Sequence, residues 1–245
     1  MNQSAAATKD EPQALLGGVE LERRLEELLG QDRFAPPRGF SSKESGDDAS
    51  LYELADGDPN GFWADQARRL HWDVPFTTVL DDSNPPFYKW FSDGKLNVSY
   101  NCLDRHVEAG RGQRIAFHWV GEEGEERAVT YAELLSDVQR MANALKQLGV
   151  RKGDVVGIYL PMIPEVVVAM LACARIGAPH NVVFGGFAPQ AVKEMEVSNA
   201  KALITVDGAR RKGKTVPIKP AVDQTMGDLE ALEHVVVVRH TSSRS

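Results

Sequence analysis

The stretch VVGIYLPMIPEVVVAMLACARIGAPHNVVF, residues 155–184, decides the fold. Apolar runs at residues 155–160 and 181–184 open and close it. Between them, residues 164–176 are apolar nearly all round and begin with a proline, which the first turn of a helix tolerates. A strand, a buried helix and a second strand in this order predict a parallel strand pair joined by a crossover helix.

The same alternation continues upstream of this stretch. Residues 115–120 and 127–129 predict a strand pair around a turn. Thr130 and Glu133 have the spacing of a capping box, in which each side chain satisfies the other's end of a helix. We expect that helix to run as far as residue 148, because Gly149 follows as a terminator.

Downstream, we expect a helix over residues 189–198 and strands over residues 202–206 and 235–238. Strands that alternate with helices predict an α/β fold. The expected architecture is an incomplete, mainly parallel sheet with flanking helices, wrapped by an irregular helical N-terminal segment.

Three regions are expected along the chain. Residues 1–17 are small and polar and predict a disordered tail. Residues 18–98 predict the helical and irregular segment, and residues 99–245 predict the first α/β part of the main domain. In the middle region the prolines and aromatic residues of 72–90 give little periodicity.

Two helices are expected within the N-terminal segment. Leucines at helical spacing predict an amphipathic helix over residues 19–29. Asp58 followed by Pro59 is a helix-start signal, so a second helix is expected over residues 58–70. The Pro, Ser and Gly residues of 34–48 predict a loop or linker.

Composition limits the function classes. The 245 residues hold 28 Lys and Arg against 35 Asp and Glu, a net charge of −7, which argues against a general nucleic-acid binder. The longest apolar run, 166–174, is about half of the roughly 20 residues that a membrane helix needs. With only Cys102 and Cys173 and no signal peptide, we expect a cytoplasmic protein in a reducing compartment.

Two features predict ligand contacts. Phe184 ends an expected strand and Gly185 and Gly186 follow it, where glycines let a backbone approach a ligand at the carboxyl end of a parallel sheet. The alternative is a tight turn without a ligand. A basic cluster in an otherwise acidic chain suggests an anion site, the alternative being a solvated loop. Its members are Arg210, Arg211, Lys212, Lys214 and Lys219.

Residues 208–215 also match the P-loop pattern G-x-x-x-x-G-K-[ST]. A P-loop must lead directly into a helix whose N-terminus faces the phosphates. Here Val216, Pro217 and Pro220 follow at once, which disfavours such a helix. The six histidines lack metal-ligand spacing, and no G-x-S-x-G nucleophile elbow is present.

Several stretches in the same order resemble the N-terminal portion of acetyl-CoA synthetase, the AMP-forming acetate–CoA ligase of the adenylate-forming enzymes. Propionyl-CoA synthetase shares much of this pattern and is the closest alternative. The most specific stretches are KWF (89–91), GKLN (94–97), NCLDRH (101–106), PMIPE (161–165), MLACARIGA (170–178) and VFGGF (183–187).

The resemblance implies a two-step reaction. Acetate attacks the α-phosphate of ATP to give acetyl-AMP and pyrophosphate, with Mg²⁺ balancing the charge, and the thiol of CoA then attacks the activated carbonyl. In this family the Phe-Gly-Gly turn and the following R-x-G-[KR] loop contact the CoA nucleotide. The matching residues here are Phe184, Gly185, Gly186, Arg211, Lys212, Gly213 and Lys214.

The family's ATP loop, acetate pocket, magnesium ligands and catalytic lid have no counterpart before Ser245. We therefore expect a fragment that is inactive by itself, with no catalytic residue of its own. The expected helix after Pro189 is also one residue shorter than the family pattern, which turns the rest of a helix by about 100°.

Three function classes remain open at this point. The first is a fragment of an acetate–CoA ligase. The second is a non-catalytic module that binds CoA or a nucleotide at the basic loop. The third is a P-loop NTPase that depends on Lys214.

Overall fold

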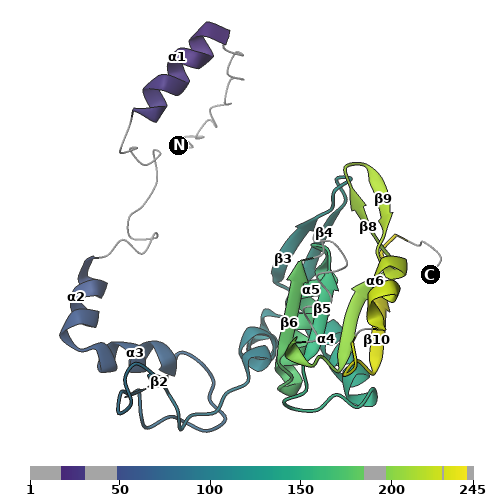
Figure 1. The fold of residues 1–245 in the computed structure, drawn as a ribbon. Coiled ribbons are helices and arrows are strands. Elements are labelled where there is room, and N and C mark those ends of the chain that lie inside the picture. The colour runs from purple at the N-terminus through teal and green to yellow at the C-terminus, as the bar shows by residue number, and fades with distance from the viewer. Residues whose placement is uncertain (1–17, 31–48, 185–196, 228, 242–245) are drawn as a thin grey trace, which may run out of the picture. The chain divides into compact units, whose positions relative to one another are not determined.

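The computed structural model describes residues 18–30, 49–184, 197–227 and 229–241 (Figure 1). The chain divides into two compact units, Met1–Asp56 and Gly57–Ser245. The expected tail over 1–17, the loop over 34–48 and most of the helix over 189–198 lie outside the described residues. The same holds for Gly185 and Gly186.

The first unit contributes two helices, α1 (Gly18–Leu29) and α2 (Ala49–Gly57), the second ending at the boundary between the units. Helix α1 confirms the amphipathic pattern, and its Arg23 pairs with Glu20 at 2.6 Å on the polar face. Helix α2 was not predicted. It is only nine residues long and ends just before the stronger start signal at Asp58.

The second unit begins with α3 (Pro59–Arg68), as expected from its cap. A carboxylate oxygen of Asp58 accepts a hydrogen bond from the Gly61 N–H at 2.9 Å, which satisfies one of the free amides at the helix start. After α3, the short antiparallel strands β1 (Leu80–Asp81) and β2 (Lys89–Trp90) interrupt the aromatic segment.

Edge-on and tilted aromatic contacts hold this irregular segment together in place of regular structure. The Trp72 ring lies 5.0 Å from Phe76 and 5.7 Å from Phe91, and the two phenylalanine rings lie 4.8 Å apart. Such pairs contribute beyond their buried area because ring edges and faces carry opposite partial charge. The aromatic residues of 72–90 thus have a packing role that helical or strand periodicity does not reveal.

Two π-helical turns, η1 (Tyr100–Asp104) and η2 (Val107–Arg111), follow this segment. Arg175 donates two hydrogen bonds to the Asp104 carboxylate, at 2.7 and 2.8 Å, and both side chains are largely buried. The Asn97 side chain donates to the Arg175 carbonyl at 3.0 Å. These contacts fasten the segment before residue 105 to the helix that carries Arg175. The predicted boundary at 98/99 remains a prediction.

Four parallel strands form the sheet of the second unit, in the order β10-β7-β5-β6. They are β5 (Val156–Leu160), β6 (His180–Phe184), β7 (Ala202–Val206) and β10 (His234–Val238). Strands β5 and β7 are buried throughout, whereas β10 is half-buried. The expected α/β architecture with a mainly parallel sheet is confirmed.

Helices α4 (Tyr131–Gln147) and α5 (Pro164–Ile176) pack against each other, and α5 contacts β5 and β6. The capping box is formed: the Glu133 N–H donates to Thr130 Oγ1 at 3.2 Å, and the Thr130 N–H donates to the Glu133 carboxylate at 2.9 Å. Gly149 ends the helix with a φ of 84°, a left-handed conformation that glycine adopts without strain.

The antiparallel pair β3 (Ile115–Val120) and β4 (Glu126–Thr130) leads into α4, as predicted. Two more strands, β8 (Gly208–Arg211) and β9 (Lys214–Pro217), form a hairpin after β7, and α6 (Lys219–Met226) follows. Neither the hairpin nor α6 was expected. Figure 1 shows the β3–β4 and β8–β9 ribbons extending from the same end of the parallel sheet.

Candidate functional site

The basic cluster forms a hairpin rather than a loop. Arg211 pairs with Lys214 across β8 and β9, and the two residues between them have positive φ angles, 50° at Lys212 and 70° at Gly213. Positive φ at both central residues is the conformation of a tight two-residue hairpin turn. The P-loop alternative is therefore wrong, because the chain enters a strand at Lys214 and not a helix. Whether this exposed hairpin binds an anion or is only solvated stays a prediction.

Asp207 anchors this hairpin at the carboxyl end of β7. One oxygen of its carboxylate accepts hydrogen bonds from the N–H groups of Gly208 and His240 at 2.8 Å and of Thr241 at 3.1 Å. Its carbonyl accepts from the Ile218 N–H at 3.1 Å, at the start of α6. A single residue thus joins the ends of β7 and β10 to the first residue of the hairpin and to α6.

The Asp207 side chain is held in its charged form. The residue is 3% exposed, and burial, the largest influence, raises the pKa of the carboxyl group. The backbone N–H groups of His240, Thr241 and Gly208 more than offset burial, so the pKa of Asp207 lies below its usual value. Its second oxygen, Oδ2, has no hydrogen-bond partner among the described residues.

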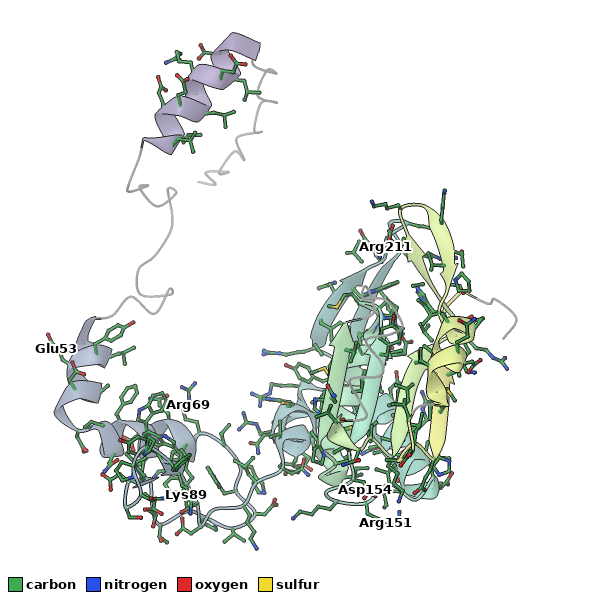
Figure 2. All side chains as sticks on the ribbon, viewed as in Figure 1. Glu53, Arg69, Lys89, Arg151, Asp154 and Arg211 are labelled. Atoms are coloured by element: carbon green, nitrogen blue, oxygen red, sulfur yellow. The ribbon has the colours of Figure 1, made fainter. Side chains whose placement is uncertain are left out.

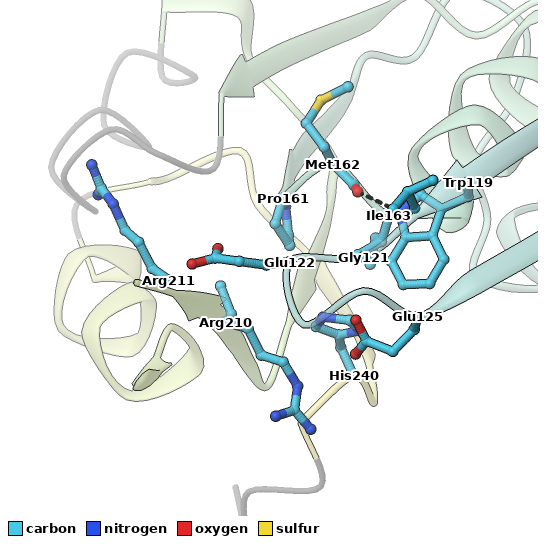
Figure 3. Close-up of a pocket in the computed structure, with 12 residues that line it drawn as sticks. Trp119, Gly121, Glu122, Glu125, Pro161, Met162, Ile163, Arg210, Arg211 and His240 are labelled. Carbon is cyan, nitrogen blue, oxygen red and sulfur yellow. Dashed lines mark hydrogen bonds between the residues drawn. The ribbon is translucent and has the colours of Figure 1, made fainter. Parts of the chain in front are cut away.

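A pocket of about 390 Å³ lies between the β3–β4 turn, the segment after β5 and the first half of the hairpin (Figure 3). The indole N–H of Trp119 donates to the Met162 carbonyl at 2.8 Å and fixes one wall. Open α/β sheets bind ligands at this carboxyl edge. The lining residues are Trp119, Val120, Gly121, Glu122, Glu125, Pro161, Met162, Ile163, Ala209, Arg210, Arg211 and His240.

Charges of both signs line this pocket. Arg210 forms an ion pair with Glu123 at 2.6 Å, and the Lys212 N–H donates to the Glu122 carboxylate. The pKa of Glu125 lies below its usual value because its own backbone N–H and that of Glu123 bind the carboxylate, against an opposing effect of burial, and Arg210 adds positive charge. The acidic β3–β4 turn and the basic hairpin are therefore joined by an ion pair and a hydrogen bond.

Two family models match the chain. The model described as AMP-binding enzyme matches residues 103–245, more than half of the chain. This chain belongs to the AMP-binding enzyme family. The model described as acetyl-coenzyme A synthetase N-terminus matches residues 49–102. The boundary between the matches falls within the π-helical region at Tyr100–Asp104.

Curated relatives named acetyl-coenzyme A synthetase confirm the resemblance to the N-terminal portion of that enzyme. The relative from Streptomyces avermitilis is 56% identical over 215 residues, which cover 87% of this chain and 33% of the relative. The relative from Mycobacterium tuberculosis is 52% identical, covering 84% and 32%. The relative from Burkholderia lata is 50% identical, covering 90% and 35%. The chain thus spans about a third of the length of these relatives.

The candidate residues that the structure describes in this AMP-binding family member lie toward the carboxyl ends of the parallel strands. Phe184 ends β6 and pairs in register with Leu160, the residue before Pro161 of the pocket. Arg211 lines the pocket, and Figure 2 shows it at the opposite end of the sheet from Arg151. Lys212, Gly213 and Lys214 form the exposed hairpin tip. In the same cluster, Lys219 pairs with Asp223.

Sequence reasoning missed Trp119, Glu122 and Asp207. Asp207 directly follows a buried strand and precedes a glycine, a position from which a carboxylate can bind several amides at a sheet edge. The acidic run 122–126 was interpreted only as a turn. Its sign, opposite to that of the basic cluster, is the signal that predicts contact between the two turns.

Other features of the described residues carry no site. No group of three or more His, Cys, Asp or Glu among them is arranged to hold a metal ion. In the described part of the chain, no helix is long and apolar enough to cross a membrane. Cys102 is exposed, whereas Cys173 is buried, and burial raises the pKa of its thiol to about 12.

Proposed function

We propose that these residues belong to an acetate–CoA ligase, which makes acetyl-CoA from acetate, ATP and CoA through acetyl-AMP, and that they carry its CoA-nucleotide site. The observation that supports this most is the basic β8–β9 hairpin at the carboxyl edge of the parallel sheet. It bears Arg211 and Lys214 side by side. The relatives named acetyl-coenzyme A synthetase favour acetate over propionate as the acid.

Phosphate recognition follows from the chemistry of the hairpin. The guanidinium of arginine binds two oxygens of one phosphate, and the ammonium of lysine adds a compact positive charge. The pocket beside Arg211 falls in the volume range of small-molecule sites, and its walls mix apolar and charged groups. The proposed CoA-contacting residues are Phe184, Gly185, Gly186, Arg211, Lys212, Gly213 and Lys214.

The proposed role of this region is to bind and orient CoA, so that its thiol reaches the activated carbonyl of acetyl-AMP. A carboxylate is a poor electrophile, whereas its mixed anhydride with AMP is a good one. Mg²⁺ would balance phosphate charge in the first step. No group of three or more His, Cys, Asp or Glu among the described residues is arranged to hold it. The need for ATP and CoA favours a cytoplasmic location.

The experiment is a calorimetric titration of the purified chain with CoA, dephospho-CoA and ATP. CoA and dephospho-CoA differ only in the 3′-phosphate monoester, so they report on phosphate recognition directly. We expect CoA to bind at least tenfold more tightly than dephospho-CoA, and Lys214→Ala to reduce this ratio. Lys152→Ala, on the loop before β5, is the charge-matched control. Equal affinity for the two ligands, or tighter binding of ATP than of CoA, would exclude the proposed site.

A further inference from the structure

Two oppositely charged turns meet beside the pocket. The β3–β4 turn carries Glu122 and Glu123, and the hairpin that faces it carries Arg210 and Lys212. Arg210 and Glu123 form an ion pair at 2.6 Å. The second contact differs, because the Glu122 carboxylate accepts a hydrogen bond from the backbone N–H of Lys212. A side chain of one turn is therefore bound to the main chain of the other.

The group that Glu122 binds is itself suited to anions. Lys212 and Gly213 both have left-handed backbone angles, and N–H groups of such turns form small concave sites for negative charge. A carboxylate resembles one face of a phosphate, since both present charged oxygens to N–H donors. Figure 3 shows the Glu122 side chain reaching across to the hairpin beside Arg211. Glu122 thus lies where a phosphate on this hairpin would bind.

We propose that Glu122 is a specificity-determining residue that competes with a ligand phosphate for the β8–β9 turn. The proposal rests on the proposed function, because it takes the hairpin as the phosphate site. A ligand must displace the carboxylate to reach the Lys212 N–H. A phosphate monoester, with a charge near −2, displaces it more readily than a singly charged phosphodiester or carboxylate does. Glu122 therefore selects ligands that carry a terminal phosphate.

Glu123 does not share this role, although it is the next residue along the chain. Its carboxylate is paired with the Arg210 guanidinium, so it fixes the hairpin through a side chain and leaves the backbone of the turn to Glu122. Glu126 starts β4, pairs with Val120 in the ladder and does not line the pocket. It carries the same charge as Glu122 on the same ribbon and serves as a matched control.

The test follows the Lys212 amide by NMR in the ¹⁵N-labelled chain during titration with inorganic phosphate. In Glu122→Gln, we expect the phosphate dissociation constant at this amide to fall on the order of fivefold, because one nearby negative charge is removed and the neutral amide oxygen that replaces it is a weaker acceptor. Glu126→Gln should change it by less than about twofold. In the same titration with acetate, Glu122→Gln should increase the affinity by a smaller factor than it does for phosphate, because acetate carries a single charge.

Unchanged phosphate affinity in Glu122→Gln overturns the proposal, as does an equal gain in Glu126→Gln, which would show only a general charge effect. A Lys212 amide that does not respond to phosphate in any variant also overturns it. Titration with CoA separates this inference from the proposed function. If CoA fails to bind while phosphate binds more tightly to Glu122→Gln, the CoA assignment is wrong and the competition by Glu122 stands.

Discussion

Replacing Arg211 with alanine should weaken CoA binding more than replacing the adjacent Arg210. A charge-assisted hydrogen bond to phosphate contributes about 1.5–3 kcal/mol. Arg211 is exposed, and water weakens its contacts, so the lower part of this range, about 1.5–2 kcal/mol, applies. At about 1.4 kcal/mol per factor of ten, the dissociation constant for CoA should rise roughly 10- to 30-fold.

Arg210 provides an internal comparison, because its guanidinium pairs with Glu123 and the residue lies outside the R-x-G-[KR] pattern of 211–214. Arg210→Ala should raise the dissociation constant by less than about threefold. Arg211→Lys should lose less CoA affinity than Arg211→Ala, because lysine keeps the positive charge. It should still bind more weakly than the unmodified chain, because lysine lacks the two-pronged geometry of the guanidinium. Isothermal calorimetry with CoA measures all three variants, and Arg151→Ala at the opposite edge of the sheet controls for loss of positive charge.

Arg211→Ala that binds CoA as tightly as the unmodified chain would refute the proposed contact. Equal effects of Arg210→Ala and Arg211→Ala would also refute it, because the two substitutions would then report only a loss of positive charge from the hairpin. Circular dichroism of each variant checks that the hairpin substitution leaves the sheet folded. An equal loss of affinity for CoA and dephospho-CoA would mean that Arg211 contacts a part of the ligand other than the 3′-phosphate.

Three further predictions concern residues outside the hairpin. A double-mutant cycle of Asp104→Asn and Arg175→Gln, measured by urea unfolding, should give a coupling energy of about 2–3 kcal/mol, because the bidentate pair is largely buried. Asp207→Asn should destabilise the chain by roughly 1–3 kcal/mol at pH 7. Since the folded pKa of Asp207 is lowered, its contribution is complete above about pH 5 and declines as the pH falls below about 4, where the two proteins should converge. Iodoacetamide at pH 8 should label exposed Cys102 and leave Cys173 unlabelled until urea is added, as mass spectrometry would detect.

The elements that sequence reasoning predicted well are those with a local physical signal. The Thr130–Glu133 capping box and the terminator Gly149 bound α4 to within a residue or two of the expectation. The apolar runs around α5 identified parallel strands because strands buried on both faces need apolar residues on both. The resemblance of several stretches to acetyl-CoA synthetase identified the AMP-binding enzyme family, which local structural signals alone do not identify.

The elements that were missed depend on partners distant in sequence. The β8–β9 ribbon was not predicted, because its residues are polar and show no strand pattern. Only its pairing register and the positive φ angles at Lys212 and Gly213 make it a hairpin. Asp207 has no local partner pattern, since two of its three amide donors lie 33 and 34 residues downstream. The π-helical turn at Tyr100–Asp104 lacks the 3.6-residue periodicity that identifies a helix.

The hydrogen bonds of Asp207 also impose an order of assembly on this region. Its carboxylate can accept hydrogen bonds from the N–H groups of residues 240 and 241 only after β10 has paired with β7. Until the ribosome has released these residues, the Asp207 carboxylate lacks two of its three amide donors, even though all residues of the hairpin have been synthesised. The anion-binding turn should therefore acquire its final geometry late in folding, with the docking of the last described strand. A substitution that slows the pairing of β10 would delay ligand binding without touching any residue that contacts the ligand.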